Sequence, residues 1–236
     1  MSRFFKGMRN ALFVLTVLGS AGSQVLADYS LVQYEFLGQP GTETFVAPSY
    51  AASGLSALNF TESGVTSNLG SNSINSAGWN NPAAYYQFGF TIQPGQSVTV
   101  DQIILTSRSS NTGPGFISLL ASVDGGAFTS VASITQTGTA YNDEFLSITP
   151  VTALNNLTFQ FVATNQTSAG GATIGSSGTF RIGDYNPAGS ATPFTINGTI
   201  NQSANVPEPA SISLVLLGGL GVGAFALRRR KNLQGS

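Results

Sequence analysis

Apolar and polar residues alternate in several separate stretches of the chain. Residues 32–36, 86–92, 157–163 and 194–200 place aliphatic or aromatic side chains at alternate positions. Successive side chains of a β-strand point to opposite faces of its sheet, so this pattern is typical of strands with one buried face. No stretch within residues 28–205 shows helical periodicity over three turns. The pattern therefore predicts an all-β domain.

The alternation changes phase once, within residues 97–106. The apolar positions shift there from Val98 and Val100 to Ile103 and Leu105. With strict alternation, the second pair would turn away from the core. One extra residue restores their direction, so we predict a β-bulge near Asp101.

Turn-forming residues separate the alternating runs. Asp124-Gly125 lies between the apolar stretches 117–123 and 128–134, and Asp-Gly suits the primed turns of β-hairpins. Clusters of proline, glycine and asparagine mark further loops. Roughly eight to ten short strands are expected, arranged as an antiparallel β-sandwich of the jelly-roll type.

The two ends of the chain have a different character from the middle. Three basic residues precede an apolar segment at 11–18, and a stretch that suits signal-peptidase cleavage ends at Ala27, directly before Asp28. Residues 1–27 are therefore predicted to be a secretory signal peptide rather than part of the fold. Residues 28–205 form the predicted domain, which is long enough to bury a core.

The C-terminal segment joins three features in a fixed order. Val206-Pro207-Glu208-Pro209 precedes a nearly continuous apolar stretch at 211–227, and the basic cluster Arg228-Arg229-Arg230-Lys231 follows. A helix of that length measures about 25 Å, at the lower limit for crossing a bilayer core of about 30 Å. The positive-inside rule places the basic cluster in the cytoplasm and the domain outside the inner membrane. Residues 232–236 form a polar tail.

Residues 206–231 resemble the PEP-CTERM sorting signal of Gram-negative bacteria. The resemblance implies that an exosortase, a membrane-embedded cysteine protease, processes the motif at the inner membrane. It also implies that the protein is then released or anchored at the cell surface or in the extracellular matrix. The central domain is similar, through looser motifs such as Asp124-Gly125-Gly126-Ala127-Phe128 and Phe180-Arg181-Ile182, to the β-sandwich modules of PEP-CTERM proteins.

Charge and missing residue types exclude several functions for residues 28–205. This range holds nine acidic residues and two basic ones, Arg108 and Arg181, for a formal charge of −7. Such a charge repels phosphate backbones, so no nucleic-acid partner is expected. The range has no cysteine, histidine or lysine, which removes the usual nucleophiles, general bases and zinc ligands. We expect the two arginines to pair with carboxylates across the sheet, and a ligand-binding role is the alternative.

The only tryptophan, Trp79, lies in an expected loop before an aromatic strand. If exposed, it would stack on a sugar ring; if buried, it would pack in the core. Calcium is the metal ion that suits the domain, because carboxylate oxygens are hard ligands. The weak candidate ligands lie in or near expected loops and match no EF-hand spacing: Asp124, Asp143, Glu144 and Asp184.

Two function classes remain open. The first is a non-catalytic structural or adhesive component of the cell surface or of an exopolysaccharide matrix. The second is a carbohydrate-binding module, in a calcium-dependent or calcium-free form, with Trp79 at its site. A polysaccharide-active enzyme is a distant third. Asp143 and Glu144 are neighbours, so on a strand they would point to opposite faces instead of forming a catalytic pair.

Overall fold

The computed structural model describes residues 24–25, 29–184 and 192–202. The predicted signal peptide with its cleavage site and the predicted sorting signal with its apolar helix lie outside these residues and stay predictions. The described part of the chain contains no helix long and apolar enough to cross a bilayer.

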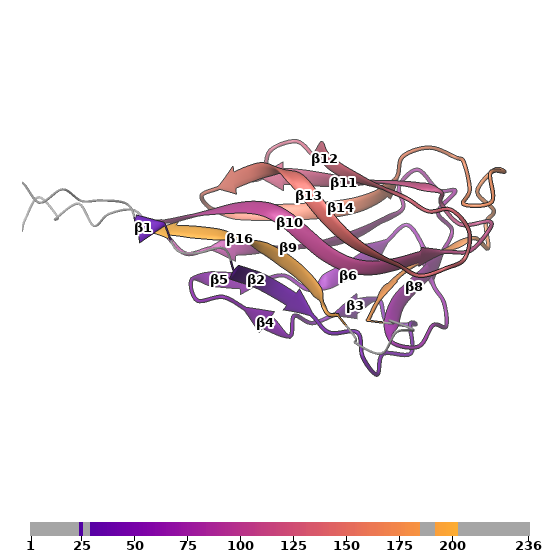
Figure 1. Ribbon diagram of the computed structural model, residues 1–236, viewed down its shortest axis with the longest axis horizontal. Coiled ribbons are helices and arrows are strands. Elements are labelled where there is room, and N and C mark those ends of the chain that lie inside the picture. Colours follow the sequence, from indigo (N-terminus) through magenta and orange to yellow (C-terminus); the bar gives the residue numbers. More distant parts are fainter. Residues whose placement is uncertain (1–23, 26–28, 185–191, 203–236) are drawn as a thin grey trace, which may run out of the picture. The chain divides into compact units, whose positions relative to one another are not determined.

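The described residues form sixteen strands in two antiparallel sheets (Figure 1). Sheet A contains β1 (Gln24–Val25), β2 (Tyr29–Tyr34), β4 (Tyr50–Ala51), β7 (Thr66–Ser67), β8 (Ser73–Ala77), β10 (Gln96–Ser109), β13 (Asn142–Ala153), β15 (Thr179–Gly183) and β16 (Phe194–Gln202). Sheet B contains β3 (Phe45–Val46), β5 (Leu55–Ala57), β6 (Phe60–Ser63), β9 (Tyr85–Ile92), β11 (Phe116–Val123), β12 (Thr129–Thr135) and β14 (Asn156–Ala163). The predicted all-β, antiparallel class is confirmed, and the finer jelly-roll assignment stays a prediction.

The long strand β10 organises sheet A. Gln102 pairs with Ser147 of β13 and with Asn197 of β16, so β13 and β16 lie on opposite sides of β10. From Thr106 onward, β10 pairs with β15 along the edge where its earlier residues pair with β16. In sheet B the strands follow the order β12-β11-β14-β9-β6-β3, with β5 also paired to β9.

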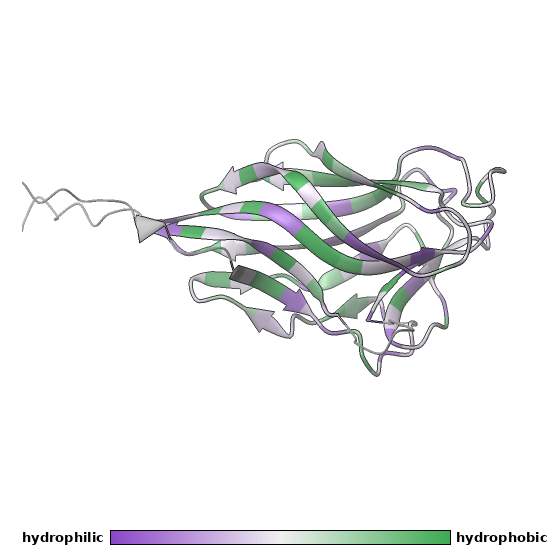
Figure 2. Cartoon of the chain, in the orientation of Figure 1, coloured by the Kyte–Doolittle hydropathy of each residue, from purple (hydrophilic) through white to green (hydrophobic). Residues whose placement is uncertain are grey.

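The predicted bulge is confirmed. The register of β10 shifts between Val100 and Gln102 against both β13 and β16. Because of this shift, Ile103 and Leu105 are buried as deeply as Val98 and Val100. The alternation elsewhere along the strands is visible in Figure 2, where hydrophobic and hydrophilic residues follow one another.

The predicted hairpin at Asp124-Gly125 is confirmed as well. It joins β11 to β12, which pair antiparallel. Asp124 and Gly125 both have positive φ angles, 51° and 78°, and the amide of Gly126 donates to the carbonyl of Val123 at 2.9 Å. Positive φ at both central residues defines a type I′ turn, whose twist matches that of the strands it connects.

The expected number of short strands was too low, for an identifiable reason. Several strands have only two or three residues, which is too short to show alternation in the sequence. Other strands are long: β10 has 14 residues and β13 has 12. Strand β13 also runs through Asp143 and Glu144, which had been expected in or near loops.

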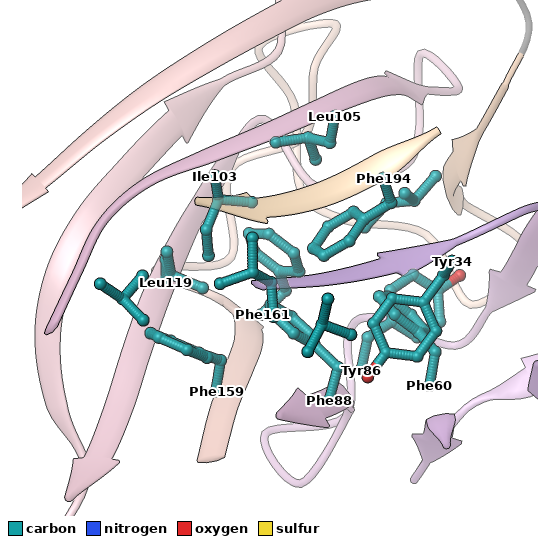
Figure 3. Close-up of a cluster of buried hydrophobic side chains, with 14 of the residues drawn as sticks. Tyr34, Phe60, Tyr86, Phe88, Ile103, Leu105, Leu119, Phe159, Phe161 and Phe194 are labelled. Carbon is teal, nitrogen blue, oxygen red and sulfur yellow. The ribbon is translucent and has the colours of Figure 1, made fainter. Parts of the chain in front are cut away.

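The two sheets pack face to face through aromatic side chains (Figure 3). Phe88 of sheet B meets Phe194 of sheet A edge-on, with ring centroids 4.8 Å apart. Tyr34 of sheet A packs edge-on against Phe60 of sheet B at 5.5 Å, and its hydroxyl donates to the carbonyl of Leu58 at 2.7 Å. The facing arrangement is that of a β-sandwich, with the core between the layers.

Phe88 is the central ring of this core, since it also contacts Phe159 and Phe161 of β14. Replacing Phe88 with alanine should lower the free energy of unfolding by about 3–5 kcal/mol, because the change removes burial and leaves a cavity. Chemical denaturation of the purified protein measures the loss. Thr91→Ala, at an exposed position of the same strand, should stay within about 0.5 kcal/mol of wild type. Equal losses in the two variants would contradict the assigned core.

Candidate functional site

Many predicted site residues lie outside the described part of the chain. They are the cleavage-site residues Ala27 and Asp28, the motif Val206-Pro207-Glu208-Pro209 and the basic cluster Arg228-Arg229-Arg230-Lys231. The remaining predicted residues are Trp79 and the four acidic residues of the domain. Each of these has a defined position in the fold.

Trp79 is a core residue, so the hypothesis of a sugar contact is wrong. It lies in the turn between β8 and β9 and has no exposed surface. Its indole N–H donates to the carbonyl of Ser76 at 2.9 Å, and its ring packs edge-on against Tyr86 at 4.9 Å and Phe180 at 5.4 Å. A ring with no exposed face cannot stack on a sugar.

Asp124 caps the turn that begins strand β14. Its carboxylate accepts the backbone N–H groups of Asn155 at 2.7 Å, Asn156 at 3.0 Å and Leu154 at 3.2 Å. These hydrogen bonds favour the charged form and lower the pKa of Asp124 below its usual value. The carboxylate therefore ties the β11–β12 turn to the turn between β13 and β14.

Asp143 and Glu144 lie side by side on β13. Asp143 accepts a hydrogen bond from the hydroxyl of Thr106 at 2.6 Å, across from it on β10. Glu144 pairs with Leu105, and its side chain points to the opposite face of the sheet from that of Asp143. Burial, and secondarily the charge of Asp143, raise the pKa of Glu144. Their opposite directions keep the two carboxylates from forming a catalytic pair.

Asp184, directly after β15, is the most deeply buried acid among the residues that the structure describes, at 2 % exposure. One carboxylate oxygen accepts the backbone N–H of Phe36, and the other, Oδ1, has no hydrogen-bond donor in the described part of the chain. Burial, together with the neighbouring Glu35 side chain, raises the pKa of Asp184 to about 8. No local pattern indicates this contact, because residues 35 and 184 are far apart in the chain and Glu35 occupies a polar position of an alternating run.

The four acids do not assemble into a metal site. Among the described residues, no three acidic, histidine or cysteine side chains lie close enough to hold a metal ion. Asp124 lies in the β11–β12 hairpin, Asp143 and Glu144 lie on β13, and Asp184 follows β15.

A different group of side chains gathers on the outward face of sheet A. Alternation places Tyr141 just before β13 on the same side as Asp143 and Phe145 of that strand. On β10, Thr106 pairs with Asp143 and Ile104 pairs with Phe145. The Arg108 guanidinium lies over the Tyr141 ring, and Arg181 of β15 pairs with Arg108. We call these seven residues the outer-face cluster. Phe145, at its end, is 66 % exposed.

The prediction that Arg108 and Arg181 pair with carboxylates across the sheet needs correction. Arg108 and Arg181 stand directly opposite each other on β10 and β15. Arg181 donates from Nη1 to the Tyr141 hydroxyl at 2.9 Å, and the Arg108 guanidinium lies 5.3 Å from the centroid of the same ring. Alternation within 141–147 is the sequence signal that would have placed Tyr141, Asp143 and Phe145 on one face.

Comparisons with known proteins bear mainly on the C-terminal segment. Residues 205–231 match the family model described as the PEP-CTERM protein-sorting motif. Among solved structures, a mutant of a family 29 carbohydrate-binding module, made to probe ligand recognition, aligns with 78 % of this chain and 99 % of its own at 11 % identity. Its TM-score of 0.34 is too low to support an argument about fold or ligand. No curated protein matches the chain.

The buried Asp184, next to the exposed Glu35, leads to a prediction about pH. An unfolded aspartate releases its proton at about pH 4, whereas Asp184 in the folded protein holds one up to about pH 8. The folded state thus binds more protons between these values, and stability should fall as the pH rises from 4 to 8, by at most about 1.4 kcal/mol per pH unit for one proton.

Asp184→Asn should remove this pH dependence. The amide keeps an acceptor for the Phe36 N–H and offers a neutral donor toward Glu35, which imitates the protonated acid. Thermal unfolding of both proteins between pH 4 and 8 tests the claim. If the variant shows the same slope as wild type, Asp184 is not the group that titrates.

Proposed function

We propose, from the PEP-CTERM sorting motif at residues 205–231, that the chain is an exported, envelope-sorted protein and that its β-sandwich is a non-catalytic structural or adhesive component of the cell surface or exopolysaccharide matrix. The motif is the observation that carries this proposal, since it indicates export, membrane association and processing by an exosortase.

The proposed route follows the order of segments in the chain. Residues 1–27 direct export across the inner membrane, and the apolar stretch within 206–231 arrests the chain there. The basic cluster stays in the cytoplasm, while residues 28–205 fold outside. Proline disfavours helix, and in the proposed route a processing protease acts on the motif that contains Pro207 and Pro209. The mature domain then reaches the cell surface or extracellular matrix.

The chemistry of the domain supports a non-catalytic role. Residues 28–205 lack cysteine, histidine and lysine. Of the acids that sequence reasoning singled out, Asp124 and Asp184 accept hydrogen bonds from backbone N–H groups of the fold. General acid–base chemistry on a polysaccharide needs two carboxyl groups facing one bond, and Asp143 and Glu144 face opposite ways.

Glycan binding is the second candidate, now at the outer-face cluster instead of Trp79. Phe145 exposes its ring on β13, which pairs with β10 at residues 142–147 and again at 151–153. An exposed aromatic ring beside charged and hydroxyl side chains suits sugars, which offer apolar ring faces and polar edges. The rigid sheet holds these groups in fixed positions, which lowers the entropic cost of binding.

The sorting step is tested by changing Glu208 to alanine. The variant should still insert in the membrane, because the apolar stretch and basic cluster are untouched, but its maturation should be blocked. Mass spectrometry of the surface-exposed wild-type protein should find a C-terminus near residues 206–209. A mature wild-type protein that keeps its apolar tail and arginine cluster would show that the tail is only an anchor.

The glycan candidate is tested by changing Phe145 to alanine. Loss of an aromatic contact of about 0.5–1.5 kcal/mol should weaken binding to a retained polysaccharide by about two- to tenfold. Affinity electrophoresis against a panel of neutral and acidic polysaccharides measures the effect. Phe45→Ala, at an exposed aromatic position of sheet B, is the matched control and should bind like wild type. Equal weakening in both variants would exclude the outer face as the site.

A further inference from the structure

The only two cationic side chains of residues 28–205 stand directly opposite each other. Arg108 and Arg181 form a cross-strand pair between β10 and β15. Like charges directly opposite on neighbouring strands destabilise a sheet. Nine acidic side chains are present in the same range, yet Arg181 pairs with Arg108 of β10 on one side and with Asn75 of β8 on the other. An anion bound between them would remove this repulsion.

Arg181 is held in place by the protein. Its Nη1 donates to the hydroxyl of Tyr141 at 2.9 Å and its Nη2 to the carbonyl of Leu69 at 3.3 Å. The backbone at Gly70 lies against the guanidinium so closely that a Cβ there would come within 2.7 Å of its central carbon. The Arg181 head group is therefore positioned before any ligand arrives.

Arg108 keeps its hydrogen-bonding capacity. Its guanidinium lies 5.3 Å from the Tyr141 ring centroid, and within the described ranges it donates no hydrogen bond. Its side chain is half-buried, so part of it reaches solvent. A guanidinium presents its donors in a planar fork that matches the two oxygens of a carboxylate.

The neighbouring side chains suit a sugar more than a small free anion. Tyr141 and Phe145 share one face of the chain and are four residues apart, which is about 13 Å along a strand. The exposed Asp143 lies between them, and it accepts a hydrogen bond from the buried Thr106. A ligand that covers this distance would place hydroxyl groups near Asp143 and a ring face near Phe145.

We propose that Arg108 and Arg181 form a carboxylate-binding site and that its ligand is an acidic polysaccharide with uronate residues. The proposal rests on the glycan-binding candidate above and specifies its ligand class. The net charge of −7 does not prevent such binding at physiological salt, where the Debye length is about 8 Å and distant acids are screened.

The test uses the purified full-length protein in mild detergent with 0.15 M NaCl. The probes are polygalacturonate, its fully methyl-esterified form, dextran and dextran sulfate. Polygalacturonate should bind, and esterification should weaken binding at least about tenfold, because it removes the charge-assisted hydrogen bonds while keeping the polymer backbone. Dextran should bind no better than the ester.

Arg108→Gln should weaken polygalacturonate binding at least about tenfold, and Arg108→Lys should lie between this variant and wild type, because lysine keeps the charge but loses the fork. The control is Thr91→Glu, which changes the net charge by the same amount at an exposed position of sheet B and should bind like wild type. Circular dichroism and thermal unfolding confirm that each variant is folded.

Two results would overturn the carboxylate site while leaving the glycan candidate in place. One is equal binding of the acid and its ester. The other is equal binding by Arg108→Gln and Thr91→Glu. Dextran sulfate that binds as tightly as polygalacturonate would overturn the assignment to carboxylates. If no polysaccharide is retained, the glycan candidate fails together with this inference, whereas the sorting proposal is unaffected.

Discussion

The aromatic contact between the two sheets is the interaction on which the rest of the domain depends. Phe88 of β9 meets Phe194 of β16 at 4.8 Å and Tyr34 of β2 at 6.5 Å, so one ring of sheet B touches two strands of sheet A. The domain has no cysteine, and no disulfide can join its layers. Burial of these rings is therefore the main force that holds the sheets together.

This core explains why the outer face of sheet A is free to carry other chemistry. Inward side chains of β10 are fixed by burial, whereas its outward side chains are limited only by their neighbours on the sheet. The bulge at Asp101 matters here, because it sets which residues of the second half of β10 point outward. Arg108, Thr106 and Ile104 share the outward face as a result. A single register error would bring Arg108 to the core side.

Sequence reasoning predicted those features that arise from local patterns. The alternating runs, the bulge near Asp101 and the Asp124-Gly125 turn each leave a signal within a few residues, and the structure confirms them. The burial of Trp79 had no such signal, because it depends on contacts with Phe180, about a hundred residues away. The opposed Arg108 and Arg181 were missed for the same reason, since their proximity follows from strand order.

A double-mutant cycle at Phe88 and Phe194 tests the central claim most directly. Each residue is changed to leucine, alone and together, and the free energy of unfolding is measured by chemical denaturation. Leucine keeps most of the buried apolar surface and removes the ring–ring contact. We expect a coupling free energy of about 0.5–1.5 kcal/mol, the range found for aromatic pairs in contact. A coupling indistinguishable from zero would contradict the claim that this aromatic contact joins the two sheets.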